Sequence, residues 1–178
     1  LSGSEGSLTS SMDIIVGKSG STLGVNIGIG PSKLPYNTRV GTNSQYQSTG
    51  ERNTSLGYET LKLNTTGGWN TAVGNMALMV NASSSLGVGV GNVYQGWFNT
   101  AVGDKAMLHN IGGSNNTAVG RSALQYNTTG SNNVAVGDMA LSSNMYGHGN
   151  IAIGSFAGSD DIGIFADSPT SSIFLGSG

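Results

Sequence analysis

The sequence predicts an all-β protein: an elongated, trimeric, β-helix- or β-roll-like fibre of short stacked strands that repeat about every 17 residues. Three observations predict this fold class. A five-residue motif that ends in Gly recurs along the chain, as expected of stacked repeat architectures. The motif combines residues that favour strands with residues that favour turns. Leu, Ile, Val and Phe supply only 39 of the 178 residues, so a single repeat has little apolar material of its own.

The motif reads Asn-Thr-Ala-Val-Gly in its clearest copies, and its spacing is constant over much of the chain. Copies and close variants occupy residues 53–57, 70–74, 99–103, 116–120, 133–137 and 150–154. The motif glycines from Gly103 to Gly154 follow one another at a constant interval. A degenerate copy at 87–91 keeps this interval after Gly74 but lies closer than one interval to Gly103. Looser copies lie at 13–17, 26–30, 37–41 and 172–176.

Each copy is expected to form a short strand that ends in a corner. Thr and Val are β-branched and suit strands, whereas Gly and Asn supply turn conformations. Strict alternation places Thr and Val on one face of the strand and Ala on the other. A second element ending in Ala-Leu follows, as at 120–124, and four residues are too few for a stable helix. We therefore expect two short strands per repeat, joined at a Gly corner and closed by a polar turn such as 127–131.

The scarcity of apolar side chains favours an oligomer. Each repeat offers about three side chains suited to a core, Val, Ala and Leu, which cannot offset an ordering entropy of about 1–2 kcal/mol per residue. Stacking lets each repeat cover its neighbour, yet a single thin column would still expose one apolar side. Several identical chains wound about an axis would bury that side. The sequence therefore predicts a homotrimer, with a monomeric solenoid as the alternative.

The repeat resembles that of distal bacteriophage tail fibres. Its cleanest copy runs from 116 to 141, where Asn-Thr-Ala-Val-Gly-x-x-Ala-Leu is followed by Asn-Thr-Thr-Gly-Ser-Asn-Asn. The core motif also resembles the head repeats of bacterial trimeric autotransporter adhesins, although those heads typically have a shorter repeat. Both resemblances imply a β-structured trimer displayed outside a cell. The tail-fibre resemblance further implies attachment to a bacterial surface receptor, often a lipopolysaccharide glycan.

The resemblance divides the chain into three parts. Residues 1–36 are expected to be an N-terminal β segment with weak repeats, 37–158 a repeat-built trimeric fibre, and 159–178 a C-terminal tip segment. Tail fibres often carry a self-cleaving C-terminal chaperone, and nothing in this sequence resembles one.

The composition argues against several classes of function. The net charge is −2 and only 9% of residues are charged, which makes a nucleic-acid-binding surface unexpected. No stretch approaches 18 apolar residues, so membrane insertion is not expected. Cysteine is absent, and the two histidines, His109 and His148, lie in no catalytic or metal-binding motif. The nine acidic residues are scattered rather than paired for glycoside cleavage. We expect no enzymatic activity, no cofactor and no metal.

Aromatic and acidic residues outside the motif are the candidates for receptor binding, because sugars stack on aromatic faces and hydrogen-bond to polar side chains. The densest aromatic group, where the repeat spacing slips, contains Tyr94, Trp97 and Phe98. Trp69 precedes a motif Asn in a linker position. The C-terminal segment adds Asp160, Asp161, Phe165 and Asp167. The structural alternative is that Trp97 and Phe98 fill a packing defect created by the irregular spacing.

Taken together, the residues and the resemblance predict the receptor-binding distal segment of a bacteriophage tail fibre, located in the virion. Its partners would be two further copies of itself, the rest of the fibre, and a host-surface polysaccharide or outer-membrane receptor. Weak equivalent sites would act together through multivalency. Two alternatives remain open: the head of a trimeric autotransporter adhesin that binds host matrix proteins, and a purely structural shaft.

Overall fold

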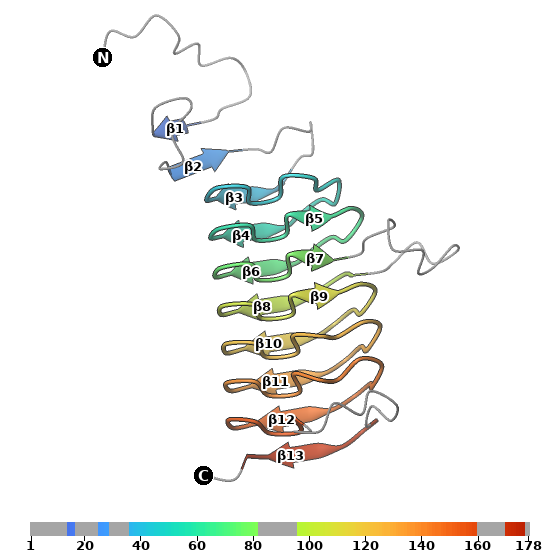
Figure 1. Cartoon of the computed structure of the whole chain (residues 1–178). Coiled ribbons are helices and arrows are strands. Elements are labelled where there is room, and N and C mark those ends of the chain that lie inside the picture. The colour runs from blue at the N-terminus through green and yellow to red at the C-terminus, as the bar shows by residue number, and fades with distance from the viewer. Residues whose placement is uncertain (1–13, 17–24, 29–35, 82–95, 160–169, 177–178) are drawn as a thin grey trace, which may run out of the picture.

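The computed structural model describes residues 14–16, 25–28, 36–81, 96–159 and 170–176. The chain winds into a stack of flat coils that runs from the N-terminal to the C-terminal end (Figure 1). The described residues form strands and turns and contain no helix. The all-β prediction is therefore confirmed for this part of the chain.

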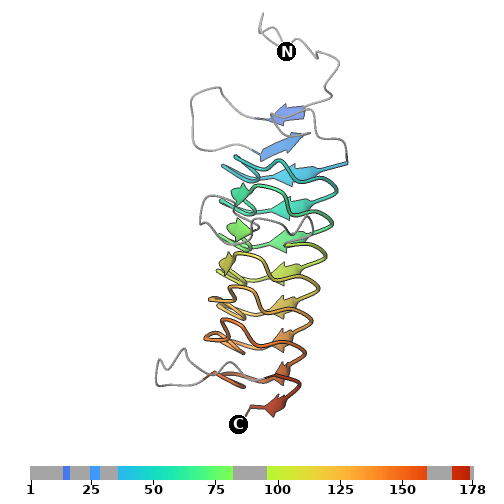
Figure 2. The same ribbon diagram turned by 90° about the vertical axis from the view of Figure 1, so that its right-hand side faces the viewer.

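A ten-stranded sheet forms one side of the stack, and turns and short strands form the other (Figure 2). Its strands, in spatial order, are β1 (Ile14–Val16), β2 (Val25–Gly28), β3 (Thr38–Val40), β4 (Thr54–Leu56), β6 (Thr71–Val73), β8 (Thr100–Val102), β10 (Thr117–Val119), β11 (Val134–Val136), β12 (Ile151–Ile153) and β13 (Ile173–Leu175). From β3 onward all neighbours are parallel, and equivalent motif positions pair, as in Ala101 with Ala118. The motif thus forms a strand in each coil.

The second predicted strand forms in only some of the described coils. A three-stranded parallel sheet contains β5 (Leu63–Asn64), β7 (Val80–Asn81) and β9 (His109–Asn110), which are all very short. In the coils that begin at β10 and β11 the same segment, at 126–127 and 143–144, is a turn and not a strand. The expectation of two strands in every repeat is therefore wrong for these coils, whose second side is held by single backbone bonds between turns, such as Leu124 N–H to Ala140 O.

The irregular spacing around residue 91 is an insertion. Strand β6 pairs directly with β8, and Thr71 lies opposite Thr100, so the coil between them contains more residues than its neighbours. The motif-like copy at 87–91 lies outside the described residues. Two of the looser N-terminal copies, at 13–17 and 26–30, coincide with β1 and β2, which pair antiparallel and so stand outside the parallel stack.

The interior of the stack is built from small side chains. The central strand residue, the second small residue and the long side chain that follows it are fully buried, as Ala118, Ala123 and Leu124 illustrate, with Met107 in place of Leu in the coil of β8. The motif Val lies on the opposite face of the strand, where Val119 and Val136 are 36% and 37% exposed. Alternation within the strand turns Val outward wherever Ala points inward, in keeping with the predicted placement of Thr and Val on one face and Ala on the other.

Two ladders of buried asparagines run along the stack. In the first ladder (Asn37, Asn53, Asn70, Asn99, Asn116, Asn133 and Asn150), each backbone N–H donates to the Oδ1 of the previous Asn at 2.7–3.0 Å. In the second ladder (Asn64, Asn81, Asn110, Asn127 and Asn144), each Nδ2 donates to the Oδ1 of the previous Asn. Both ladders also donate to the same glycine carbonyls, for example Gly130 O. The two ladders thereby pair buried amide groups between successive coils.

Left-handed backbone recurs at residues other than Gly. The second residue after the motif Gly has φ near +55° in successive coils, as in Met76, Lys105 and Met139. This conformation costs an ordinary L-residue about 1 kcal/mol relative to Gly. The tight winding of each coil therefore carries a repeated local strain.

We expect Lys105→Gly to be about 1 kcal/mol more stable than Lys105→Ala, because both remove the same side chain and only Gly relieves the φ of +55°. Urea denaturation of the two variants measures the difference. Equal stability would show that the left-handed residue is unstrained.

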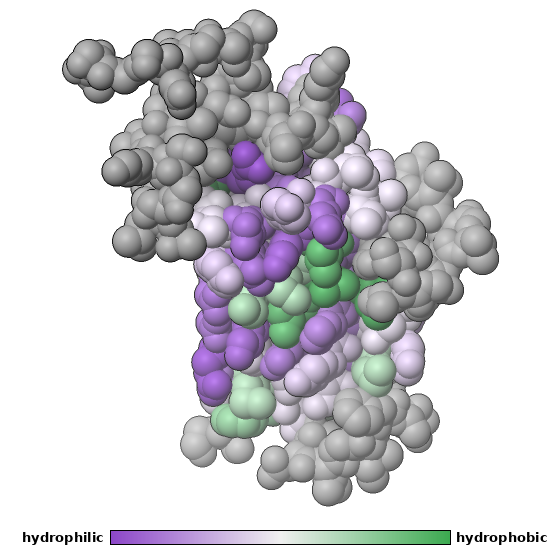
Figure 3. All heavy atoms as spheres, turned by 45° about the horizontal axis from the view of Figure 1, so that its top comes forward, coloured by the Kyte–Doolittle hydropathy of each residue, from purple (hydrophilic) through white to green (hydrophobic). Residues whose placement is uncertain are grey.

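The surface is mainly polar on the side drawn in Figure 3, where hydrophilic residues predominate and hydrophobic ones gather near the middle. In the part of the chain that the structure describes, no helix has the length and apolar character to cross a membrane.

Candidate functional site

The residues that immediately precede the first four Asn of the first ladder form an exposed stack of side chains. This stacked column consists of Tyr36, Arg52, Trp69 and Phe98, one from each successive coil. The Arg52 guanidinium lies 5.1 Å from the centre of the Tyr36 ring and 4.6 Å from that of Trp69. The Trp69 and Phe98 rings stack with centroids 5.5 Å apart. Each of the four residues has a φ between 54° and 74°, which aligns the side chains along the stack.

Trp97 lies beside this column and packs over a glycine. Its ring centroid is 4.8 Å from that of Trp69 and 6.0 Å from that of Phe98. Gly68 occupies the equivalent position in the coil before, and a Cβ added there would stand 3.9 Å from the indole. The same Cβ would stand 3.1 Å from Glu51 O, so the glycine lets the backbone pack close to the indole, and the open space lies to the side of this contact, towards Thr49 and Thr66.

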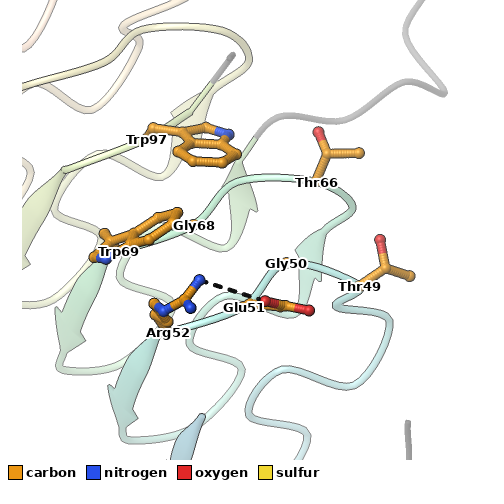
Figure 4. Close-up of a pocket in the computed structure, with 8 residues that line it drawn as sticks. All are labelled: Thr49, Gly50, Glu51, Arg52, Thr66, Gly68, Trp69 and Trp97. Carbon is orange, nitrogen blue, oxygen red and sulfur yellow. Dashed lines mark hydrogen bonds and ion pairs between the residues drawn. The ribbon is translucent and has the colours of Figure 1, made fainter. Parts of the chain in front are cut away.

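This space is a cavity of about 340 Å³, within the range of about 300–1,000 Å³ typical of small-molecule sites. It is lined by Thr49, Gly50, Glu51, Arg52, Thr66, Gly68, Trp69 and Trp97. In Figure 4 the two indoles stand on one side and the hydroxyls of Thr49 and Thr66 on the other. The two Thr residues come from successive coils, so the winding of the chain places them side by side.

The charges at the cavity cancel. Arg52 lies 3.5 Å from the Glu51 carboxylate, and both side chains are nearly half exposed. The guanidinium is also held between two aromatic rings, and cation–π contacts of this kind contribute about 0.5–1 kcal/mol at exposed sites. Glu51 supplies an acceptor, Arg52 supplies donors, and the pair adds no net charge. The cavity is thus suited to a neutral, polyhydroxylated ligand with one apolar face.

The structure brings together three of the predicted site residues, Trp69, Trp97 and Phe98. Arg52 and Phe98 contact the Trp69 indole within the stacked column, which leaves less of this indole for a ligand. Trp97 lines the cavity. The remaining predicted site residues, Tyr94, Asp160, Asp161, Phe165 and Asp167, lie outside the described residues.

The sequence analysis missed Glu51 and Arg52 as site residues. A signal was present, because these two residues precede Asn53 as Gly68 and Trp69 precede Asn70, in the same motif positions. Aligning the residues before each motif Asn would have placed Arg52 beside Trp69.

The two histidines lie apart from the cavity and in different environments. His109 stacks on Tyr126 with centroids 5.6 Å apart, and its burial lowers the pKa of the imidazole. His148 accepts a hydrogen bond at Nδ1 from the Ser131 N–H at 3.0 Å. Among the residues that the structure describes, no three His, Cys, Asp or Glu side chains are grouped so that they could hold a metal ion.

The charged residues at the Gly corners lie at the surface. Asp104 accepts a hydrogen bond from Asn75, and Arg121 pairs with Asp138 at 2.8 Å. These contacts join neighbouring coils at exposed positions, where an ion pair contributes at most about 1 kcal/mol.

Comparisons with known proteins found no matching family model, no matching curated protein and no matching solved structure.

Proposed function

We propose that this chain is the receptor-binding segment of a bacteriophage tail fibre, a homotrimer in the virion that attaches to a host-surface glycan of the lipopolysaccharide O-antigen type. The cavity beside Trp97 is the proposed sugar site. The observation that carries the proposal is the combination of an indole, a glycine floor and the Thr49, Thr66, Glu51 and Arg52 side chains around one cavity.

The chemistry of this cavity fits a sugar. A pyranose ring presents an apolar C–H face that can lie against the Trp97 indole, while its hydroxyls reach donors and acceptors around the rim. The Glu51–Arg52 pair is neutral overall, which favours an uncharged sugar over a phosphate. The proposal is for binding without cleavage. Three copies of a weak site on each fibre, and several fibres on each virion, would multiply the avidity.

We expect Trp97→Ala to weaken binding of the isolated fragment to host polysaccharide about tenfold or more, since stacking on an aromatic ring is worth about 1–3 kcal/mol. Surface plasmon resonance on immobilised O-antigen polysaccharide measures the change. Tyr146→Ala is the control, because Tyr146 is an exposed aromatic residue that does not line the cavity.

Three results would argue against the proposal. Unchanged binding of the Trp97→Ala variant would remove the cavity from recognition. Tight binding to an outer-membrane protein, with no hit on a glycan array, would replace the sugar as receptor. Shortened polysaccharide chains after incubation, seen by gel electrophoresis, would identify an enzyme.

A further inference from the structure

Along its parallel part, the ten-stranded sheet carries no charged side chain on its outward side. This outer face consists of the first and third residues of β3, β4, β6, β8, β10, β11, β12 and β13. Every one of these residues is Thr, Val, Leu or Ile. The register aligns them in two rows, so that Thr100 lies beside Thr117 and Val102 beside Val119. The outer face is therefore a regular array of β-branched and aliphatic side chains.

Exposed aliphatic side chains concentrate on this outer face. Within the described part of the chain, all the large aliphatic residues that are exposed belong to it, namely Leu56, Val119, Val136, Ile151, Ile153, Ile173 and Leu175. The rows also become more apolar towards the C-terminal end, where Ile151 and Ile173 take the place of Thr. Groups of exposed apolar side chains of this kind mark interaction surfaces.

Within the described residues, the parallel part of the sheet is covered on one face only. In α/β proteins, parallel sheets are packed on both faces. The Ala and Leu side chains cover the inner face, and Figure 2 shows the rest of the described coils on that one side of the sheet. Charged residues lie elsewhere, for example Arg121 and Asp138 at the corners. The outer face thus has the composition of a buried surface.

We propose that the outer face is the contact surface between copies of this chain, which pack around an axis parallel to the stack. The periodicity of the outer face favours a second copy of this chain as the partner. Side chains on neighbouring parallel strands repeat about every 4.8 Å, and only a surface with the same repeat can interdigitate with them over the whole length. A second copy running in the same direction has that repeat in both rows. Because the outer face has no charged side chain, it offers no contact to a partner that binds through ion pairs.

The inference rests on the homotrimer of the proposed function and assigns its interface. Three outer faces turned to a common axis would bury the Val and Ile rows of each protomer against its two neighbours. The cavity beside Trp97 would then occur three times at the same height along the fibre. In this packing Val would stabilise the trimer from outside the coil, while Ala and Leu fill the coil itself.

The test compares a charge on the outer face with a charge elsewhere. Val136→Lys places an ammonium group in the proposed interface, and Tyr126→Lys places one at an exposed position off the sheet. Sedimentation equilibrium should give three times the 18.0 kDa chain mass for the wild-type protein and for Tyr126→Lys. Val136→Lys should shift to the mass of one chain, with its far-UV circular dichroism unchanged.

A second measurement covers the case in which Val136→Lys does not fold. The chain has no cysteine, so single Val119→Cys and Tyr126→Cys variants report proximity without background. Oxidation should link two copies through Cys at position 119 and leave the 126 variant unlinked. A wild-type trimer that resists Val136→Lys and links only through position 126 would overturn the assigned face while leaving the homotrimer intact. A wild-type monomer at every concentration would overturn both the face and the homotrimer, and sugar binding would then be judged separately.

Discussion

Replacing Gly120 with Ala is expected to lower the free energy of unfolding by about 3 kcal/mol or more. Gly120 has a φ of +136°, and an added Cβ would overlap the carbonyl oxygen of Gly137 in the next coil. Backbone strain at such a residue costs about 1–3 kcal/mol by itself. The overlap adds to it, because the obstacle is backbone that is hydrogen-bonded in place: Gly137 N–H donates to Val119 O at 2.8 Å.

The matched control separates strain from overlap. Gly149 also has a positive φ, of +71°, but its nearest neighbour to an added Cβ is the Ser171 hydroxyl at an ordinary 3.4 Å. Gly149→Ala should therefore cost about 1 kcal/mol. Thermal denaturation of both variants, followed by circular dichroism, tests the difference. Equal losses for the two would show that neighbouring coils are packed less closely than the structure indicates.

Asn116→Ala should destabilise the fold by about 2–4 kcal/mol, since it interrupts the first ladder and leaves a cavity. The Asn116 Oδ1 accepts the Asn133 N–H at 2.9 Å, and its Nδ2 donates to Gly130 O at 2.8 Å. Removing the side chain leaves the Asn133 N–H buried without its acceptor. Gly130 O keeps its bond from Asn127. The cost therefore arises mainly from one orphaned backbone donor.

Asn75→Ala is the comparison for this prediction. Asn75 is exposed and donates to Asp104 at a Gly corner, so its loss should change stability by less than about 0.5 kcal/mol. Guanidinium denaturation of both variants measures the two free energies. If Asn116→Ala proved as mild as Asn75→Ala, the ladder would be replaceable by water and would not hold the coils together.

The alternation of the motif predicted which side chains share a face, but not which face is inside. Thr and Val do lie together on one side of the strand and Ala on the other. The choice of interior depends on the width of the coil. Neighbouring turns approach so closely that Ala fits at 0% exposure, and this closeness is a tertiary property that a five-residue window does not contain.

The role of Asn was less accessible to sequence reasoning. Asn was assigned to turns, its commonest local role. In the structure the motif Asn is buried, and its amide joins the backbone of successive coils, as Asn116 does with Asn99, Asn133 and Gly130. Its recurrence at one motif position was visible, yet the partner atoms come from other coils and appear only when the chain is wound.

The candidate site, too, was predictable from the sequence only in part. The irregular spacing drew attention to Trp97 and Phe98, and the structure places them beside Trp69. Arg52 belongs to the coil before Trp69 and joins the site only because the coils stack in register. Residues that meet through winding are thus predictable once the repeat positions are aligned, whereas the cavity beside Trp97 becomes visible only in the folded chain.

The hydrogen bonds of the two asparagine ladders give the stack a polarity. In both, the donor of each bond comes from the later residue and the acceptor from the earlier one, so the amide dipoles point the same way from Asn37 to Asn150. Aligned dipoles in a file polarise one another and add along their length. Backbone bonds of the opposite sense, such as Thr117 N–H to Asn133 O, run beside the ladders and offset these dipoles. The consequence that remains is one of direction: only a motif stacked in the same orientation would continue both ladders.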